Sequence, residues 1–363
     1  MDRNDRSRAY SEGMTPRDLV LAASRGEAVP RTPVTPYMGN FAAALVGTPI
    51  DEYCTNARTM AESQLAAQRL VGQDAVVAQS DGYYMAEAFG LRTRRRQNDT
   101  PIPVSPLVDD LAAVDRLAVP DPCHDGRMPV YLEAIRLLRQ SAGEALAVRA
   151  CGTGAFSLAG HLIGPDNLVA RLAMLTVEPS DHDEAALRRL MEICTETTAR
   201  FAGAAVDAGA DIVMSGDSLA SLDMISPTLY ETWVWPYERE FFARIDRPVR
   251  RAGAASLLHI CGNTLPIVSA MAATGADILE IDWKVPIAQA ARTVRKARPD
   301  HPPAIMGNLD PSAVLLQASE SEVSSAAARA VSEGGTGFLL GSGCEVAPAT
   351  PVANMRAMVS AAS

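Results

Sequence analysis

The chain has 363 residues, of which 48% are apolar, so it is long enough to bury a sizeable core. Its formal net charge of −10 argues against a nucleic-acid partner, and the absence of any run of about 18 apolar residues argues against a membrane span. The N-terminus lacks the apolar stretch of a secretory signal and the six cysteines are widely spaced, which predicts a cytoplasmic protein with reduced thiols.

The predicted elements form one domain of alternating strands and helices. Residues 1–30 predict an N-terminal helical extension, with Thr15-Pro16 as its start signal, and residues 31–363 predict the main domain. There, short apolar runs closed by small or polar residues alternate with longer segments of helical periodicity. This pattern is typical of a single (β/α)8 barrel, a TIM barrel in the α/β class. The expected strands are 33–37, 75–79, 146–151, 211–215, 256–260, 277–281, 303–306 and 337–340.

Polar residues follow the ends of these strands. In a barrel, the carboxyl ends of all strands lie on one face, where such proteins keep their active sites. We therefore expect these residues to lie around one common site. In chain order they are Asn40, Asp81, Asp217, His259, Cys261, Asp282, Asn308 and Cys344.

Three of these residues suit a metal ion. His259 and Cys261 are two positions apart at the end of a strand, so their side chains face the same side, and Cys344 ends another strand. One imidazole and two thiolates with a fourth position open form a ligand set suited to catalytic zinc, which could hold either a substrate thiol or a water. The structural alternative is a strand-end histidine with a satisfied hydrogen bond beside two buried apolar thiols.

Several motifs occur in a fixed order along the chain. They are Gly154-Ala155-Phe156-Ser157, Ala208-Gly209-Ala210-Asp211, His259-Ile260-Cys261-Gly262-Asn263, Gly307-Asn308-Leu309-Asp310-Pro311, Gly341-Ser342-Gly343-Cys344 and Thr350-Pro351-Val352-Ala353-Asn354. Together they resemble the uroporphyrinogen decarboxylase superfamily, and most closely its cobamide-dependent methyltransferases. The resemblance implies the same (β/α)8 barrel, a corrinoid such as cobalamin as methyl carrier, and zinc bound by His259, Cys261 and Cys344.

One stretch departs from the decarboxylases of that superfamily. Those enzymes carry an arginine-rich substrate motif near the N-terminus, whereas the corresponding residues 36–41 of this chain contain no arginine. A substrate with many carboxylates requires such cations. The departure therefore counts against decarboxylation of a porphyrinogen.

Other polar residues are candidates for the chemistry around the metal. Asp217 is a candidate acid, base or temporary fourth zinc ligand, with a helix N-cap as its structural alternative, and Asp81 is a second catalytic candidate. Asn40, Asp282 and Asn308 are candidate cofactor contacts, with the organisation of turns as the alternative.

The expected function is transfer of a methyl group between a corrinoid and a small-molecule thiol, with zinc activating the thiolate. The corrinoid would be free cobalamin or would belong to a corrinoid protein, and a homodimer is compatible with the sequence. Three alternatives stay open: a demethylase that passes methyl from a methylated substrate to a corrinoid protein, a metal-free decarboxylase-like lyase, and a catalytically silent tetrapyrrole-binding protein.

Overall fold

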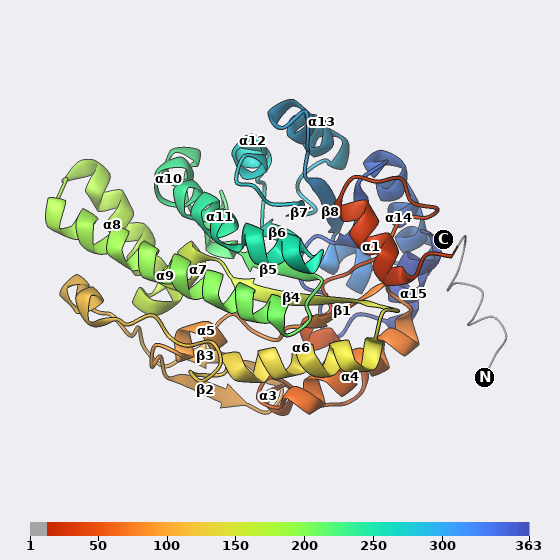
Figure 1. Ribbon diagram of the computed structural model, residues 1–363, viewed down its shortest axis with the longest axis horizontal. Coiled ribbons are helices and arrows are strands. Elements are labelled where there is room, and N and C mark those ends of the chain that lie inside the picture. Colours follow the sequence, from red (N-terminus) through yellow and green to blue (C-terminus); the bar gives the residue numbers. More distant parts are fainter. Residues whose placement is uncertain (1–12, 363) are drawn as a thin grey trace.

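The computed structural model describes residues 13–362. Their centre is a curled sheet of seven parallel strands in the order β1-β4-β5-β6-β7-β8-β9, so each strand pairs with the next one along the barrel wall (Figure 1). The expected α/β barrel-like fold is confirmed. The strands are β1 (Ala75–Ala78), β4 (Ala147–Thr153), β5 (Ile212–Gly216), β6 (Ala255–Ile260), β7 (Ile278–Ile281), β8 (Ala304–Leu309) and β9 (Phe338–Ser342).

A short extended segment closes the barrel between β9 and β1. The Thr35 N–H donates to the carbonyl of Leu340 in β9 over 2.8 Å, and the Asp74 N–H, just before β1, donates to the carbonyl of Val34 over 2.8 Å. In this segment, regular β-pairing is limited to one isolated bridge between Val34 and Leu340. The expectation of a full strand over 33–37 was therefore wrong. Pro33 and Pro36 lack the N–H groups that a ladder requires.

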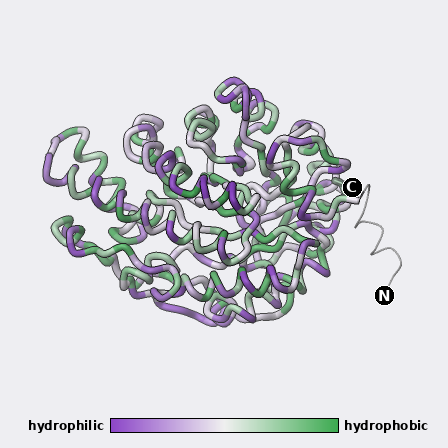
Figure 2. Tube along the Cα trace, viewed as in Figure 1, coloured by the Kyte–Doolittle hydropathy of each residue, from purple (hydrophilic) through white to green (hydrophobic). Residues whose placement is uncertain are grey.

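Helices surround the sheet in a ring. The neighbours α4, α6, α9 and α11 pack in turn, α12, α13, α14 and α15 continue the ring, and α15 packs against α4 (Figure 1). Hydrophilic residues lie on outer helices such as α13 (Figure 2). The ring helices are α4 (Ala57–Val71), α6 (Met128–Ala142), α9 (Asp181–Asp207), α11 (Trp235–Ala252), α12 (Val268–Ala272), α13 (Ile287–Ala297), α14 (Glu320–Gly334) and α15 (Val352–Ser360).

The remaining elements lie outside the central sheet and the ring of helices. An antiparallel hairpin, β2–β3, lies between β1 and β4 along the chain. These elements are α1 (Pro16–Ser24), α2 (Gly39–Leu45), α3 (Ile50–Tyr53), α5 (Tyr84–Glu87), β2 (Thr93–Arg96), β3 (Asp99–Pro103), α7 (Ala155–Ile163), α8 (Pro165–Val177), α10 (Pro227–Trp233), the 3-10 turns 111–116, 218–220 and 265–267, and the π-helical turn 311–316.

Side-chain alternation along the strands separates two cores. Residues such as Val148, Leu258 and Leu279 face the helices, whereas their neighbours face the barrel interior. The interior core also includes Val20 of α1, so this helix closes the amino-terminal end of the barrel. Because the period of a strand is two, Leu257 points inward and so does His259.

Two further observations bear on the class of protein. Within residues 13–362, no helix is long and apolar enough to cross a membrane. The six cysteines form no disulfide bond with one another.

A buried acid in α11 gives the fold a pH dependence. The Tyr230 hydroxyl donates to Glu238 Oε2 over 2.6 Å, while Oε1 has no hydrogen-bond partner. Burial, together with the charge of Asp217, raises the pKa of Glu238 well above its ordinary value. The folded state therefore retains a proton that the unfolded state loses, so this acid lowers stability as pH rises from about 4.5 toward the folded pKa.

We expect the stability of Glu238→Gln, relative to that of the wild type, to be greater at pH 8 than at pH 5. The wild type loses stability over this range, whereas the neutral amide incurs no ionisation cost. The gain is at most about 1.4 kcal/mol per pH unit. Urea unfolding at the two pH values measures it, with Glu240→Gln, a half-exposed acid of the same helix paired with Arg244, as control. A difference from wild type that is identical at both pH values would contradict this assignment.

Candidate active site

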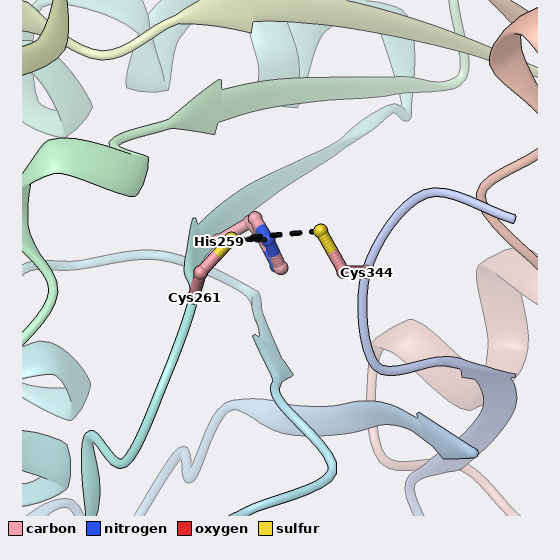
Figure 3. Close-up of side chains that lie close together, drawn as sticks. All are labelled: His259, Cys261 and Cys344. Atoms are coloured by element: carbon pink, nitrogen blue, oxygen red, sulfur yellow. Dashed lines mark hydrogen bonds between the residues drawn. The ribbon is translucent and has the colours of Figure 1, made fainter. Parts of the chain in front are cut away.

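Strand β6 ends at a cluster of one imidazole and two thiols (Figure 3). His259 Nε2 lies 3.2 Å from Cys261 Sγ, and Cys261 Sγ lies 3.6 Å from Cys344 Sγ. One donor atom from each residue lies within 4.8 Å of the other two. The three residues that the sequence predicted to meet therefore do meet, and they could hold a metal ion.

The loop after β9 brings Cys344 to this point. The Gly343 N–H donates to the carbonyl of Leu309 over 2.7 Å, which joins the ends of β8 and β9. A Cβ at Gly343 would lie 2.6 Å from the backbone nitrogen of Trp283. Only glycine allows this close approach, so the glycine before Cys344 sets how near the second thiol comes to β6.

The three groups of the cluster have shifted pKa values, and the two thiols are shifted in opposite directions. The hydrogen bond with Cys344 and the charge of His259 lower the pKa of Cys261 to about 3, although burial opposes this. Burial alone would lower the pKa of His259, but the neighbouring Cys261 thiolate raises it well above its ordinary value. The hydrogen bond with Cys261, together with burial, raises the pKa of Cys344. One sulfur is thus a thiolate at neutral pH, as a metal ligand must be.

A buried ion pair lies directly behind the histidine. Glu280 on β7 is opposite His259 in the parallel register, and its Oε2 lies 3.2 Å from His259 Nδ1. This contact is electrostatic rather than a well-aligned hydrogen bond, since Nδ1 has no aligned acceptor. Both terminal nitrogens of Arg149 on β4 donate to Glu280, over 2.7 and 2.6 Å, and both side chains are fully buried. The pair keeps Nε2, not Nδ1, turned toward the thiols.

A cavity of about 320 Å³ opens beside the cluster. His259 and Cys344 line it, together with groups from the ends of β1, β4 and β5 and from β3 of the hairpin. Cys151, the last residue of the third expected strand, also lines it. Its other polar lining side chains include Gln79, Asp81, Thr153, His161, Ser218 and Glu345.

Asp81 lines the cavity but is already held by partners. The Arg127 guanidinium donates to both of its oxygens, over 2.8 and 2.9 Å, and the Tyr131 hydroxyl donates over 3.1 Å. The Tyr83 N–H donates to it as well. A catalytic role for Asp81 stays a prediction. These contacts also make Asp81 a residue that fixes the loop after β1.

Asp217 binds the start of a helix, which is the structural alternative to a catalytic role. Its carboxylate is fully buried and accepts from the Ser157 N–H over 2.6 Å and from the Phe156 N–H over 3.2 Å, at the start of α7. Burial raises the pKa of Asp217, and it is absent from the cavity lining. The structure thus places Asp217 as a cap that ties α7 to β5, and a catalytic role stays a prediction.

The three candidate cofactor contacts organise turns. Asn40 exchanges hydrogen bonds with Ser80 over 2.9 and 2.8 Å. Asp282 accepts from the Gly262 N–H over 3.0 Å, directly after Cys261, and the amide of Asn308 donates to the carbonyl of Asp282 over 3.1 Å. None of the three lines the cavity, so cofactor contact stays a prediction for them.

Sequence reasoning missed four groups around the cluster. Arg149 and Glu280 are charged residues inside apolar strand runs at inward positions, a signal that could have been read as a buried pair. Arg127 and Glu345 had no comparable signal, because the first begins a helix and the second lies in a loop. Only the fold brings them to Asp81 and to Asn40.

Known proteins resemble this chain over nearly its whole length. A family model described as uroporphyrinogen decarboxylase (URO-D) matches residues 15–363. Methylcobamide:CoM methyltransferase MtbA from Methanosarcina acetivorans is 29% identical over 352 residues, covering 96% of this chain and 97% of the relative. Uroporphyrinogen decarboxylase from Thermus thermophilus is 30% identical over 355 residues, covering 94% and 96%. The solved structure of a methyltransferase from Methanosarcina mazei matches with a TM-score of 0.83 at 28% identity, covering 96% and 98%.

Proposed function

The chain belongs to the uroporphyrinogen decarboxylase family, and on this premise we propose that it is a methyltransferase that moves methyl between a corrinoid and a thiol. The observation that carries the proposal is the cluster of His259, Cys261 and Cys344 beside the cavity. The relatives include enzymes named for both methyl transfer and decarboxylation, so the choice rests on the site.

The cluster fits a zinc ion. Zinc bonds of about 2.3 Å to sulfur and about 2.0 Å to nitrogen place tetrahedral ligand atoms about 3.5 to 3.8 Å apart. The spacings of 3.2 Å between His259 Nε2 and Cys261 Sγ and of 3.6 Å between the two sulfur atoms are close to this. Glu280 behind His259 Nδ1 is the kind of carboxylate partner that orients a metal-bound imidazole. The three residues would hold the metal and leave one position open toward the substrate.

Zinc at this site would lower the pKa of a bound thiol while leaving its sulfur nucleophilic. The chain itself would position the reactants. The cavity would receive the thiol, and β6 and the loop after β9 would direct its sulfur toward the opening of this cavity. The corrinoid would supply the methyl group and keep both electrons of the broken carbon–metal bond, and the thiol would give up its proton to solvent as its sulfur takes the methyl group. The corrinoid would approach the mouth free or carried by a partner protein.

The charges of the cavity disfavour a decarboxylase of polycarboxylated porphyrinogens. Among the described residues that line it, none is lysine or arginine. Arg127 and Arg149 lie behind the wall, and both are paired with carboxylates. Several substrate carboxylates would enter without cationic partners, which is costly in a buried site.

The test is a joint measurement of zinc content and methyl transfer. We expect protein purified without chelators to contain about one zinc per chain and to transfer methyl from methylcobalamin to a small thiol, followed by the loss of methylcobalamin absorbance. Removal of the metal with a chelator should abolish transfer, and added zinc should restore it. Full activity of the metal-free protein, or decarboxylation of uroporphyrinogen without methyl transfer, would overturn the proposal.

A further inference from the structure

Trp283 lies between the two loops that carry the thiols of the cluster. It directly follows Asp282, whose carboxylate accepts from the Gly262 N–H over 3.0 Å in the loop of the first thiol. On the other side, its backbone nitrogen lies 2.6 Å from the point where a Cβ on Gly343, the residue before the second thiol, would sit. The backbone of Trp283 is therefore fixed beside both loops, at the carboxyl-terminal face of the barrel.

The side chain of Trp283 is exposed although its backbone is held so closely. It is 48% exposed and is not part of the cavity lining, whereas Trp233 is buried and Trp235 is half-buried. Tryptophan is among the residues that contribute most to the binding of partners, because its large flat face loses much water on contact. The indole of Trp283 thus offers an apolar surface beside the cluster and outside the cavity.

The loop after β5 adds a second apolar side chain. Lys284 Nζ donates to Asp223 Oδ2 over 2.8 Å, which joins this loop to the loop after β7. Met224 follows Asp223 and is 40% exposed, and Trp283 precedes Lys284. The ion pair therefore brings Met224 and Trp283 to the same side of the barrel opening.

Apolar side chains are also exposed on the opposite side of the opening. Thr100 and Pro101 of β3 line the cavity together with residues 79–83 after β1, and Ile102 and Val104 just beyond them are exposed. Seven strands and the closing segment make eight positions around the barrel, and β7 is four positions from β1. A flat ligand that covers the cluster would therefore meet apolar side chains on two opposite sides.

The ligand of this surface must be larger than the cavity. The cavity of about 320 Å³ is at the lower end of the range for drug-sized ligands, and a corrinoid is several times larger than such a ligand. Its macrocycle would therefore lie across the opening, while the smaller thiol enters. A planar conjugated ring stacks on an aromatic face, and the contact removes the indole from water.

Resting on the proposed function, we propose that Trp283 stacks against the corrin macrocycle and, with Met224, holds its methyl-bearing face over the sulfur cluster. The thiol inside the cavity and the methyl group outside it would then meet at the opening. Trp283 would bind the methyl carrier and leave the thiol untouched. Its loss should therefore weaken binding of the corrinoid and not binding of the thiol.

Equilibrium dialysis of the zinc-loaded protein against methylcobalamin, in the dark and without thiol, measures this binding apart from transfer. We expect Trp283→Ala to weaken binding about tenfold, which corresponds to about 1.4 kcal/mol. Trp283→Phe keeps an aromatic face and should weaken it less than about threefold. Met224→Ala should weaken it about two- to threefold. Leu70→Ala on α4, which removes an equally exposed apolar side chain, should leave it unchanged.

The zinc content and the two KM values separate corrinoid binding from support of the cluster. All four variants should keep their zinc, and Trp283→Ala should raise the KM for methylcobalamin but not the KM for the thiol. The inference would be overturned if Trp283→Ala bound methylcobalamin as tightly as the wild type, or if Trp283→Ala and Trp283→Phe lost binding equally. Loss of zinc from both Trp283 variants would also overturn it, because Trp283 would then support the cluster instead.

Methyl transfer by the wild type separates this inference from the proposed function. Transfer from methylcobalamin that is unaffected by Trp283→Ala would leave the function standing and overturn the role of Trp283. Binding of methylcobalamin that depends on Trp283, without transfer to any thiol, would do the reverse.

Discussion

Replacing Cys344 with alanine is expected to remove zinc from the protein and to reduce methyl transfer more than about 100-fold. Loss of a partner that only orients a metal ligand already costs 10- to 100-fold in metal affinity or activity, and Cys344 supplies a ligand atom itself. Its Sγ lies 3.6 Å from Cys261 Sγ and completes the cluster, so His259 and Cys261 alone would hold a metal weakly. Zinc per chain after dialysis, and the rate of methylcobalamin loss, measure the effect.

The same substitution elsewhere provides the matched control. Cys123 is an exposed free cysteine, so Cys123→Ala should retain zinc and full transfer. A circular-dichroism melt of the Cys344→Ala protein separates loss of the ligand from loss of the fold. If Cys344→Ala kept one zinc per chain and wild-type transfer, the assignment of the three ligands would be wrong.

Arg149→Met is expected to destabilise the protein by about 3–5 kcal/mol. The substitution removes the guanidinium that pairs with both oxygens of Glu280 and leaves this carboxylate, at a position of zero solvent exposure, with only its 3.2 Å contact to His259; breaking a buried pair has that cost. Burial alone would raise the pKa of Glu280, but Arg149, followed by His259, lowers it to about 2, so Glu280 is charged at neutral pH. Urea unfolding at pH 7 measures the loss of stability.

A second substitution tests the physical reason. Removing both charges in Arg149→Met/Glu280→Leu should recover much of the lost stability, because no charge then stays buried alone. Arg136→Met, an exposed arginine paired with Glu133, should change stability by less than about 1 kcal/mol. An Arg149→Met protein as stable as the Arg136→Met control would show that the pair does not support the barrel.

The buried pair also connects stability to chemistry. Arg149 holds Glu280, and Glu280 faces the Nδ1 of the histidine whose Nε2 faces the thiols. The polar layer inside the barrel thus lies directly beneath the cluster. Arg149 and Glu280 therefore both stabilise the barrel and orient His259.

The sequence alone was sufficient for the barrel and for the three clustered residues. Alternation of side chains along a strand is local, so the positions of His259 and Cys261 followed from their spacing of two. The expectation that strand ends meet on one face brought in Cys344, 83 positions later. The first strand was the exception, since the prolines around Val34 prevent a regular ladder and leave a single bridge.

The tertiary structure decided the roles of the remaining polar residues. Whether Asp217 faces the cavity or caps α7 depends on how β5 and α7 pack, and Asp81 is paired only because α6 places Arg127 beside it. Spacing along the chain predicts which side of a strand a residue faces, but the partner of a charge comes from distant segments that only packing brings together.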